Sequence, residues 1–342
     1  MKFVRFLLFP FAILYDLITS IRNSFFNAGV FKETTFYTPI IVVGNLSVGG
    51  TGKTPQIEYL IRLLKDFYKV SVLSRGYKRK TKGFLLVNEN HTANDVGDEP
   101  LQYFKKFTNI SVAVDENRVE GIHNLMDQKS PEVLLLDDAY QHRKVKGSFY
   151  ILLTKYDDLF TEDFLLPTGN LRESRAGAKR ANVIVVTKCP FDLKEVEKEN
   201  IKRKLQQYKK EVYFTTISYA DKISGNQQLS IGELKKFEVL LITGIANPNP
   251  LLEFLTEKEI KFIHLKFADH HHFTTKEIEE IKQKFEVINV DKKLILTTEK
   301  DYTRLSSKLK ELSFLQIKTR FLEAENTFND LVKSHIQQNQ QY

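Results

Sequence analysis

The sequence predicts an α/β protein in which a doubly wound, mostly parallel sheet is followed by a second, smaller α/β lobe. Short apolar runs of strand length alternate with helical stretches through the first half of the 342-residue chain. Apolar runs that are separated by helices are typical of strands buried on both faces of a parallel sheet. The expected strands are residues 39–43, 69–73, 110–114, 133–136, 149–153 and 183–186.

The character of the chain changes after Lys188. Residues 194–210 form a strongly charged, helix-like segment. Strand-like and helix-like runs then resume, which indicates a second α/β unit. The expected strands are residues 211–218, 239–243 and 294–297, and the expected helices are residues 250–258 and 275–285. We therefore expect an N-terminal helix in residues 1–30, a core in 31–210 and a smaller lobe in 211–342.

Composition limits the partners. The chain has 51 Lys and Arg against 43 Asp and Glu, a net charge of +8. This excess suits phosphorylated partners such as nucleotides, anionic lipid surfaces or nucleic acid, and charge alone does not choose among them. The single cysteine, Cys189, permits no internal disulfide and no Cys-rich zinc site, which agrees with a reducing cytoplasmic compartment.

The N-terminus is apolar and rich in phenylalanine, with Lys2, Arg5 and Arg22 around the apolar stretch. Its uncharged part, residues 6–15, is shorter than the ~20 residues that span a bilayer. A signal peptide would need a small-residue cleavage site, which does not follow. A helix packed on the protein's own core is the other alternative. Because apolar residues surround most of this helix, we predict that it lies on an anionic membrane surface.

A glycine loop, residues 44–55, follows the first expected strand and precedes a helical pattern in residues 57–64. Strand, glycine loop and helix in that order predict a phosphate-binding loop (P-loop) and a P-loop NTPase-like fold. The motif G-x-x-x-x-G-K-[ST] calls for glycine at position 47, where this chain has Ser47. The expected nucleotide contacts are Val48, Gly49, Gly50, Thr51, Gly52, Lys53, Thr54 and Pro55.

Acidic residues complete the predicted nucleotide site. Lys53 is expected to reach the β- and γ-phosphates, and the Thr54 hydroxyl to bind Mg²⁺. Asp137 and Asp138 end an apolar run, and we expect Asp137 to hold Mg²⁺ directly or through water while Asp138 shares this role. Residues 186–190 place Pro190 where a GTPase would carry aspartate. ATP is therefore the favoured nucleotide.

Seven blocks of the sequence resemble the tetraacyldisaccharide 4′-kinase family and occur in that family's order. They are residues 43–55, 73–77, 96–100, 136–142, 166–173, 267–270 and 298–301. The resemblance implies ATP- and Mg²⁺-dependent phosphorylation of the 4′-hydroxyl of an acylated glucosamine disaccharide 1-phosphate, which gives lipid IVA in lipid A biosynthesis. It also implies a P-loop core with a second lobe, working as a peripheral or monotopic enzyme at the cytoplasmic face of the inner membrane.

The resemblance also implies two catalytic residues, Asp98 and His270, which act with Lys53 of the P-loop. Asp98 lies in a turn-like segment between Gly97 and Pro100. Such an aspartate is often a local cap, but this block resembles the one that carries the family's base. His270 resembles the partner of that base, and lobe closure would bring the two together. Glu99 is expected to assist the Mg²⁺ shell or bind substrate, with a turn-stabilising role as the alternative.

Substrate contacts are expected from arginines, because a guanidinium group matches phosphate oxygens. Arg75, Arg118 and Arg172 are the candidates, although each is equally compatible with a surface ion pair. Asn170 is the candidate for a sugar hydroxyl, and residues 298–301 receive no role. We expect a monomer that does not bind nucleic acid, since no such motif is present. The alternative function is a membrane-associated P-loop switch ATPase without a lipid acceptor.

Overall fold

The larger lobe is built on a nine-stranded sheet in the order β14-β8-β7-β6-β1-β5-β2-β4-β3. The computed structural model describes residues 5–340. The strands of this sheet are β1 (Ile40–Asn45), β2 (Val70–Ser74), β3 (Leu85–Leu86), β4 (Ser111–Val114), β5 (Val133–Asp137), β6 (Phe149–Lys155), β7 (Val183–Thr187), β8 (Glu211–Tyr219) and β14 (Ile317–Phe321). Only the pairs β3–β4 and β8–β14, at the two edges, are antiparallel. The predicted parallel sheet is therefore confirmed.

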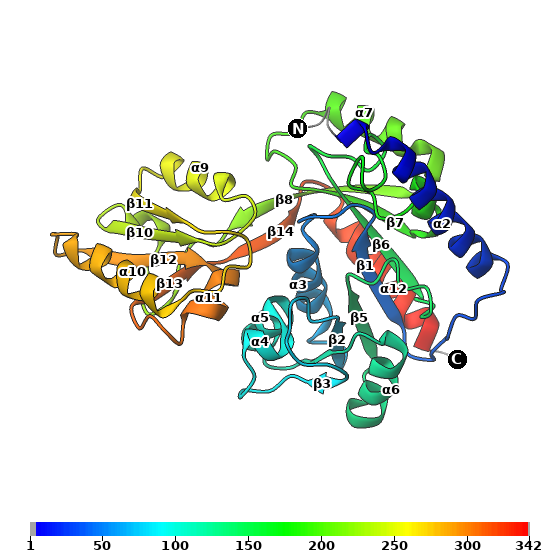
Figure 1. Cartoon of the computed structure of the whole chain (residues 1–342), viewed down its shortest axis with the longest axis horizontal. Coiled ribbons are helices and arrows are strands. Elements are labelled where there is room, and N and C mark those ends of the chain that lie inside the picture. The colour runs from blue at the N-terminus through cyan, green and yellow to red at the C-terminus, as the bar shows by residue number, and fades with distance from the viewer. Residues whose placement is uncertain (1–4, 341–342) are drawn as a thin grey trace.

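Helices cover both faces of the large sheet (Figure 1). One face packs on α3 (Lys53–Leu64), α5 (Asp98–Lys106) and α12 (Glu325–Gln340). The other packs on α6 (Arg118–Lys129) and α7 (Glu195–Leu205). Because both faces are buried, the central strands consist mostly of apolar residues, which is the pattern that identified them in the sequence. The short elements of this lobe are α4 (Ala93–Val96), η1 (Arg175–Arg180) and η2 (Gln206–Tyr208).

The smaller lobe contains a five-stranded sheet in the order β11-β10-β12-β13-β9. Its strands are β9 (Ser224–Gly225), β10 (Glu238–Thr243), β11 (Lys261–Lys266), β12 (Lys293–Thr298) and β13 (Leu312–Leu315). One face packs on α8 (Ile231–Leu234) and α9 (Asn249–Glu257), and the other on α10 (Thr275–Val287) and α11 (Glu299–Leu305). The expected second α/β unit is therefore present.

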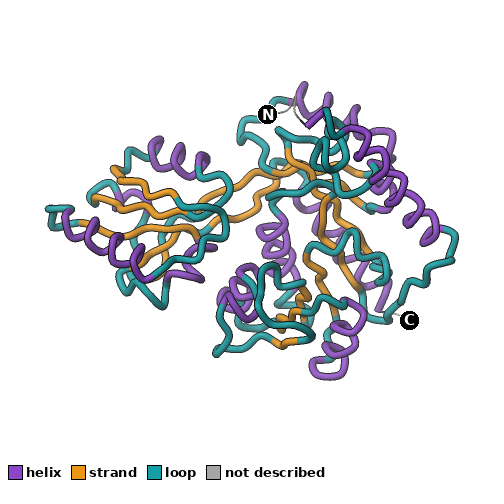
Figure 2. Tube along the Cα trace, viewed as in Figure 1, coloured by secondary structure: helices purple, strands orange, loops and turns teal. Residues whose placement is uncertain are grey.

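The division between the lobes differs from the one expected at residue 210. Strand β8 belongs to the large sheet, and the chain returns to that sheet through β14 and α12. The strands β8 and β14 run side by side from one lobe to the other (Figure 2). Phe328, Val332 and Ile336 of α12 are fully buried in the core of the large lobe. The smaller lobe is thus an insertion between β8 and β14, because its two connections pair with each other.

A long helix, α2 (Phe9–Asn27), lies along the outside of the larger lobe (Figure 1). Most of its large apolar side chains are exposed, and only Ala12, Thr19 and Phe26 are buried. Within residues 5–340, no helix is both long enough and apolar enough to cross a bilayer. The basic residue Lys2, which formed part of the predicted flank, lies outside the described residues.

Candidate active site

The P-loop joins the end of β1 to the start of α3. Gly49 and Gly52 adopt the left-handed region, with φ of 105° and 83°, which glycine enters without a steric penalty. A side chain at Gly49 would meet no atom within 4 Å, so this bend opens onto free space. The Thr51 hydroxyl is buried and has no hydrogen-bond partner in the described structure. An open loop of backbone N–H groups at a helix N-terminus fits a nucleotide phosphate.

Position 47 does not require the expected glycine, because the backbone of Ser47 is extended. It forms an antiparallel bridge with Leu171. On either side of Ser47, the Val48 N–H donates to the Asn170 carbonyl oxygen at 2.8 Å, and the Arg172 N–H donates to the Leu46 carbonyl oxygen at 2.7 Å. The loop of residues 164–173 therefore supports the first arm of the P-loop. A residue held in a bridge does not need the conformational freedom of glycine.

Lys53, Asp138 and Arg172 form a charged cluster beside the P-loop. The Lys53 Nζ lies 3.7 Å from Asp138 Oδ1, and the Arg172 Nη2 donates to the same oxygen at 2.8 Å. Arg172 also donates to the Asn45 carbonyl oxygen at 3.0 Å, which ties this cluster to the end of β1. Burial raises the pKa of Asp138, but Lys53 and Arg172 outweigh it and hold the pKa below its ordinary value. Asp138 is therefore a carboxylate at neutral pH.

Asp137 is the more deeply buried of the two acidic residues. The hydroxyl groups of Ser74 and Tyr103 donate to its Oδ2 at 3.4 and 3.3 Å, and Thr54 lies near the Tyr103 hydroxyl. Burial, followed by the charges of Asp138 and Glu99, raises the pKa of Asp137 to about 7. A cation beside it would restore the charged form.

These residues fit a magnesium ion that is shared with a nucleotide. Among residues 5–340, no group of three or more His, Cys, Asp or Glu side chains is placed to hold a metal by itself. Mg²⁺ usually takes one or two carboxylates and completes its shell with water and phosphate oxygens. Asp137, Asp138 and the nearby Thr54 provide such a partial set. The structure gives Glu99 another partner, because Lys300 Nζ lies 3.5 Å from its Oε1.

Asp98 and His270 are in contact, as the family resemblance implied. Asp98 is the first residue of α5, follows Gly97 with φ of 92°, and is only 1% exposed. His270 comes from the smaller lobe, and its Nδ1 lies 2.7 Å from Asp98 Oδ2. The Tyr77 ring packs edge-on against the imidazole, with centroids 5.5 Å apart. Burial raises the pKa of Asp98, but hydrogen bonds from His270 and Arg304 outweigh it and lower the pKa.

Two residues at this site were missed by the sequence reasoning. Arg304 donates through Nε and Nη2 to both oxygens of Asp98, at 2.5 and 2.6 Å. Lys300 Nζ lies 3.0 Å from His270 Nε2. Lys300 lies in the family-like block of residues 298–301, and Arg304 follows four residues later on the same face of α11. That helical spacing was the available signal.

The other predicted substrate residues are spread around the same edge of the sheet. Arg75 is exposed. Arg118, at the start of α6, is only 3% exposed, and its Nε and Nη2 atoms have no hydrogen-bond partner in the described structure. Burial and the charges of Arg118 and Arg75 lower the pKa of His142 to about 4. Asn170 contacts the N-terminal segment, because its Oδ1 accepts from Arg5 Nη1 at 3.2 Å.

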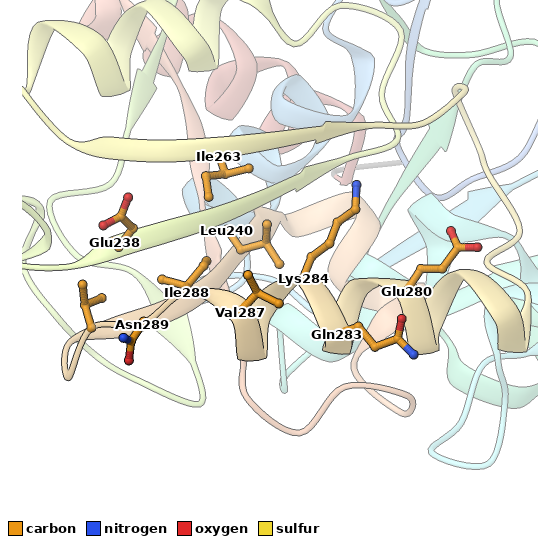
Figure 3. Close-up of a pocket in the computed structure, with 10 residues that line it drawn as sticks. Glu238, Leu240, Ile263, Glu280, Gln283, Lys284, Val287, Ile288 and Asn289 are labelled. Atoms are coloured by element: carbon orange, nitrogen blue, oxygen red, sulfur yellow. The ribbon is translucent and has the colours of Figure 1, made fainter.

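A cavity of about 600 Å³ lies elsewhere, on the smaller lobe (Figure 3). It is formed by β10, β11 and the C-terminal end of α10, and its lining includes Leu240, Ile263 and Val287. None of the predicted site residues lines it. The cavity is therefore separate from the phosphate-binding edge of the large sheet.

Comparison with known proteins agrees with this geometry. The family model described as tetraacyldisaccharide-1-P 4′-kinase (LpxK) matches residues 4–337. Proteins named tetraacyldisaccharide 4′-kinase from Flavobacterium psychrophilum and Flavobacterium johnsoniae are 53% and 51% identical, and each match covers 98% or more of both chains. The crystal structure of LpxK from Aquifex aeolicus in complex with ATP superimposes with a TM-score of 0.79 at 30% identity, covering 97% of this chain and 99% of that one. A match this complete includes both lobes and the P-loop, so the chain belongs to the tetraacyldisaccharide 4′-kinase family.

Proposed function

We propose that this protein transfers the γ-phosphate of ATP to the 4′-hydroxyl of a tetraacyldisaccharide 1-phosphate, giving lipid IVA. The contact between Asp98 and His270 carries the proposal. It places a carboxylate oxygen of the larger lobe, Asp98 Oδ2, 2.7 Å from an imidazole nitrogen of the smaller lobe, His270 Nδ1. Such a pair suits a reaction in which a sugar hydroxyl loses a proton. Family membership supports the same reaction.

The P-loop lobe would bind the nucleotide. The loop N–H groups of Gly49, Gly50 and Gly52 and the Lys53 ammonium group would hold the β- and γ-phosphates. Thr54, Asp137 and Asp138 would hold Mg²⁺, which neutralises charge on the transferred phosphate when it is bound. Glu99 remains a predicted contributor to this shell or to substrate binding.

Asp98 would take the proton. The 4′-hydroxyl oxygen forms the new bond to the γ-phosphorus, the bond from that phosphorus to the β–γ bridging oxygen breaks, and ADP leaves with the released electron pair. The hydroxyl proton passes to the Asp98 carboxylate. His270 would hold that carboxylate in place through its Nδ1–H group. A carboxylate that is only 1% exposed offers little room for competing water.

Cationic residues near the nucleotide site would bind the anionic acceptor. Arg118 has donor atoms that lack partners in the described structure, and Arg75 lies close enough to lower the pKa of both Arg118 and His142. Arg172 would clamp phosphate oxygens through its guanidinium group. Asn170 remains a predicted sugar contact. The monomeric state remains a prediction.

The helix α2 would dock the enzyme on the cytoplasmic face of the inner membrane. Phe11, Leu14 and Leu17 of this helix are 62%, 54% and 56% exposed, and Leu7, just before it, is 78% exposed. A continuous exposed apolar surface of this kind is unusual on a soluble lobe and is typical of an interfacial helix. The Tyr15 hydroxyl donates to the Arg172 carbonyl oxygen at 2.9 Å, so the helix is fixed next to the proposed substrate site.

Phosphate transfer tests the proposed reaction. Purified protein, Mg²⁺ and γ-labelled ATP are mixed with the disaccharide 1-phosphate lipid in detergent micelles, and labelled lipid is measured. We expect the wild type and Asp127→Asn, an isosteric change at an exposed carboxylate, to label the lipid, and Asp98→Asn to lose most activity. ATP consumption without lipid labelling would refute the kinase and favour a switch ATPase.

Vesicle flotation tests the membrane contact. Wild-type protein should float with vesicles that contain anionic lipid, whereas the double variant Leu14→Glu and Leu17→Glu should remain in the soluble fraction. Val196→Glu is a matched control, because Val196 is 72% exposed on α7 and lies outside α2. Equal flotation of the double variant and the control would contradict docking through α2.

A further inference from the structure

Arg304 holds the Asp98 carboxylate from the opposite lobe. Its Nε and Nη2 atoms donate to the two carboxylate oxygens at 2.5 and 2.6 Å, and its Nη1 donates to the His271 carbonyl oxygen at 2.8 Å. A guanidinium that binds both oxygens fixes the plane of a carboxylate as well as its position. Asp98 therefore cannot rotate while Arg304 stays bound.

Lys300 and Asp98 contact the two ring nitrogens of His270 and favour the same tautomer. Lys300 lies one helical turn before Arg304 on α11, and its Nζ is 3.0 Å from His270 Nε2. An ammonium group has donors and no acceptor, so Nε2 must accept. The proton of the neutral ring is then on Nδ1, which donates to Asp98 at 2.7 Å. The opposite tautomer would place two acceptors, Nδ1 and the carboxylate oxygen, against each other.

The start of α11 is itself firmly anchored. The Thr298 hydroxyl accepts from the Asp301 N–H at 3.2 Å and donates to Asp301 Oδ2 at 2.7 Å. The same Asp301 oxygen accepts from the Gly244 N–H at 2.9 Å, and the Gly244 carbonyl oxygen accepts from the His270 N–H at 3.1 Å. One short network therefore fixes both α11 and the backbone of His270, whose φ is 59°.

We propose that Lys300 and Arg304 are positioning residues for phosphate transfer: Lys300 holds the His270 ring through Nε2, and Arg304 sets the orientation of Asp98. This inference rests on the proposed role of Asp98 as the base. Neither residue is expected to touch the reacting atoms, because Arg304 contacts Asp98 and Lys300 contacts His270 and Glu99. The arrangement also explains why residues 298–301 form a family-like block without contributing a catalytic group.

Kinetics test the inference first. Arg304→Ala and Lys300→Met should each lower kcat by about 10²-fold, the cost of a small displacement of a reacting group, while KM for the lipid and for ATP stays within about threefold of wild type. Arg304→Lys should keep more activity than Arg304→Ala. Added guanidinium should partly restore Arg304→Ala and should not restore Asp98→Ala. Lys310→Met, at an exposed lysine beyond the same helix, is the matched control.

Nitrogen-15 NMR of labelled histidine tests the contact between Lys300 and His270 without using activity. The His270 signals are assigned by their loss in His270→Asn. We expect the Nδ1–H form in the wild type, in Lys310→Met and in Lys300→Met, because Asp98 accepts from Nδ1 in all three proteins. The Nε2 resonance should move in Lys300→Met, which removes the donor to that nitrogen, and should stay in place in Lys310→Met. An unchanged Nε2 resonance in Lys300→Met, or an unchanged kcat in Arg304→Ala, would overturn the inference. If Asp98→Asn keeps wild-type activity, the proposed base is wrong, and the NMR result still decides the positioning by Lys300.

Discussion

Lys106 lies between two buried carboxylates, one from each lobe. Its Nζ is 2.7 Å from Glu58 Oε2 on α3 and 2.7 Å from Glu299 Oε2 on α11. Arg62 Nη1 also lies 3.5 Å from Glu58 Oε2, but burial still disfavours the charged form of Glu299, so a proton near neutral pH lowers the cost of burying it. Burial, followed by the charge of Glu58, raises the pKa of Glu299 to about 7 from its ordinary value of 4.5. Replacing Glu299 with glutamine should therefore change how stability depends on pH.

The sign and size of the effect follow from the two pKa values. In the unfolded chain Glu299 loses its proton near 4.5, whereas in the folded chain it keeps the proton up to about 7. The folded protein therefore binds more protons in this window, and stability from this group is fully present below pH 4.5 and is lost as the pH rises through 7. The difference between the pKa values corresponds to a loss of about 3 kcal/mol.

Urea unfolding of the wild type and Glu299→Gln at pH 5, 6, 7 and 8 measures this loss. Glutamine resembles the protonated acid, so the two proteins should be about equally stable at pH 5, and the variant should be about 2–3 kcal/mol more stable at pH 8. Glu311→Gln, at an exposed carboxylate, should show no such divergence. A constant difference at every pH, or a variant that is the less stable protein at pH 8, would refute the reasoning.

Three further substitutions test other parts of the structure. Gly97→Ala should lower the free energy of unfolding by about 1–3 kcal/mol and remove most of the kinase activity. Gly97 has φ of 92°, and the new Cβ would lie 3.1 Å from Gly76 Cα. Thermal unfolding measures the loss of stability, and kcat measures the loss of activity. Lys53→Met should lower kcat by about 10²–10³-fold and leave the melting temperature nearly unchanged, and normal kcat would contradict its role at the phosphates. Phe328→Ala should lower the free energy of unfolding by about 3–5 kcal/mol, because Phe328 is fully buried, whereas Phe67→Ala, at an exposed position, should have little effect.

Short stretches of sequence were enough to predict the P-loop and the central strands of the larger lobe. The P-loop is continuous in sequence, and Asp137 ends its own apolar strand, so each prediction needed only one segment and its neighbours. The central strands were equally clear because burial on both faces removes polar residues from them. The departure at Ser47 is an exception, because its extended backbone depends on a bridge to Leu171, which is distant in the sequence.

Signals that depend on two distant segments were harder to interpret. The alternating pattern of β14 fits either sheet, and only its pairing with β8 assigns it to the larger lobe. In the sequence, nothing distinguishes Arg304 from other arginines on helices. Its role is seen only in the folded structure, where the smaller lobe brings it to Asp98. The contact between Asp98 and His270 was predicted through the family resemblance, since nothing in their separate sequences brings residues 172 positions apart together.

The division of the site between the two lobes suggests how the enzyme would control its reaction. The nucleotide site is complete within the larger lobe, because the P-loop and Asp137 come from neighbouring strands. The proposed base is incomplete there, since His270, Lys300 and Arg304 all come from the smaller lobe. ATP could therefore bind before Asp98 is oriented, and water that reached the γ-phosphate in an open form would meet no ordered base. Assembling the base only when the lobes meet would thus favour transfer to the lipid hydroxyl over hydrolysis.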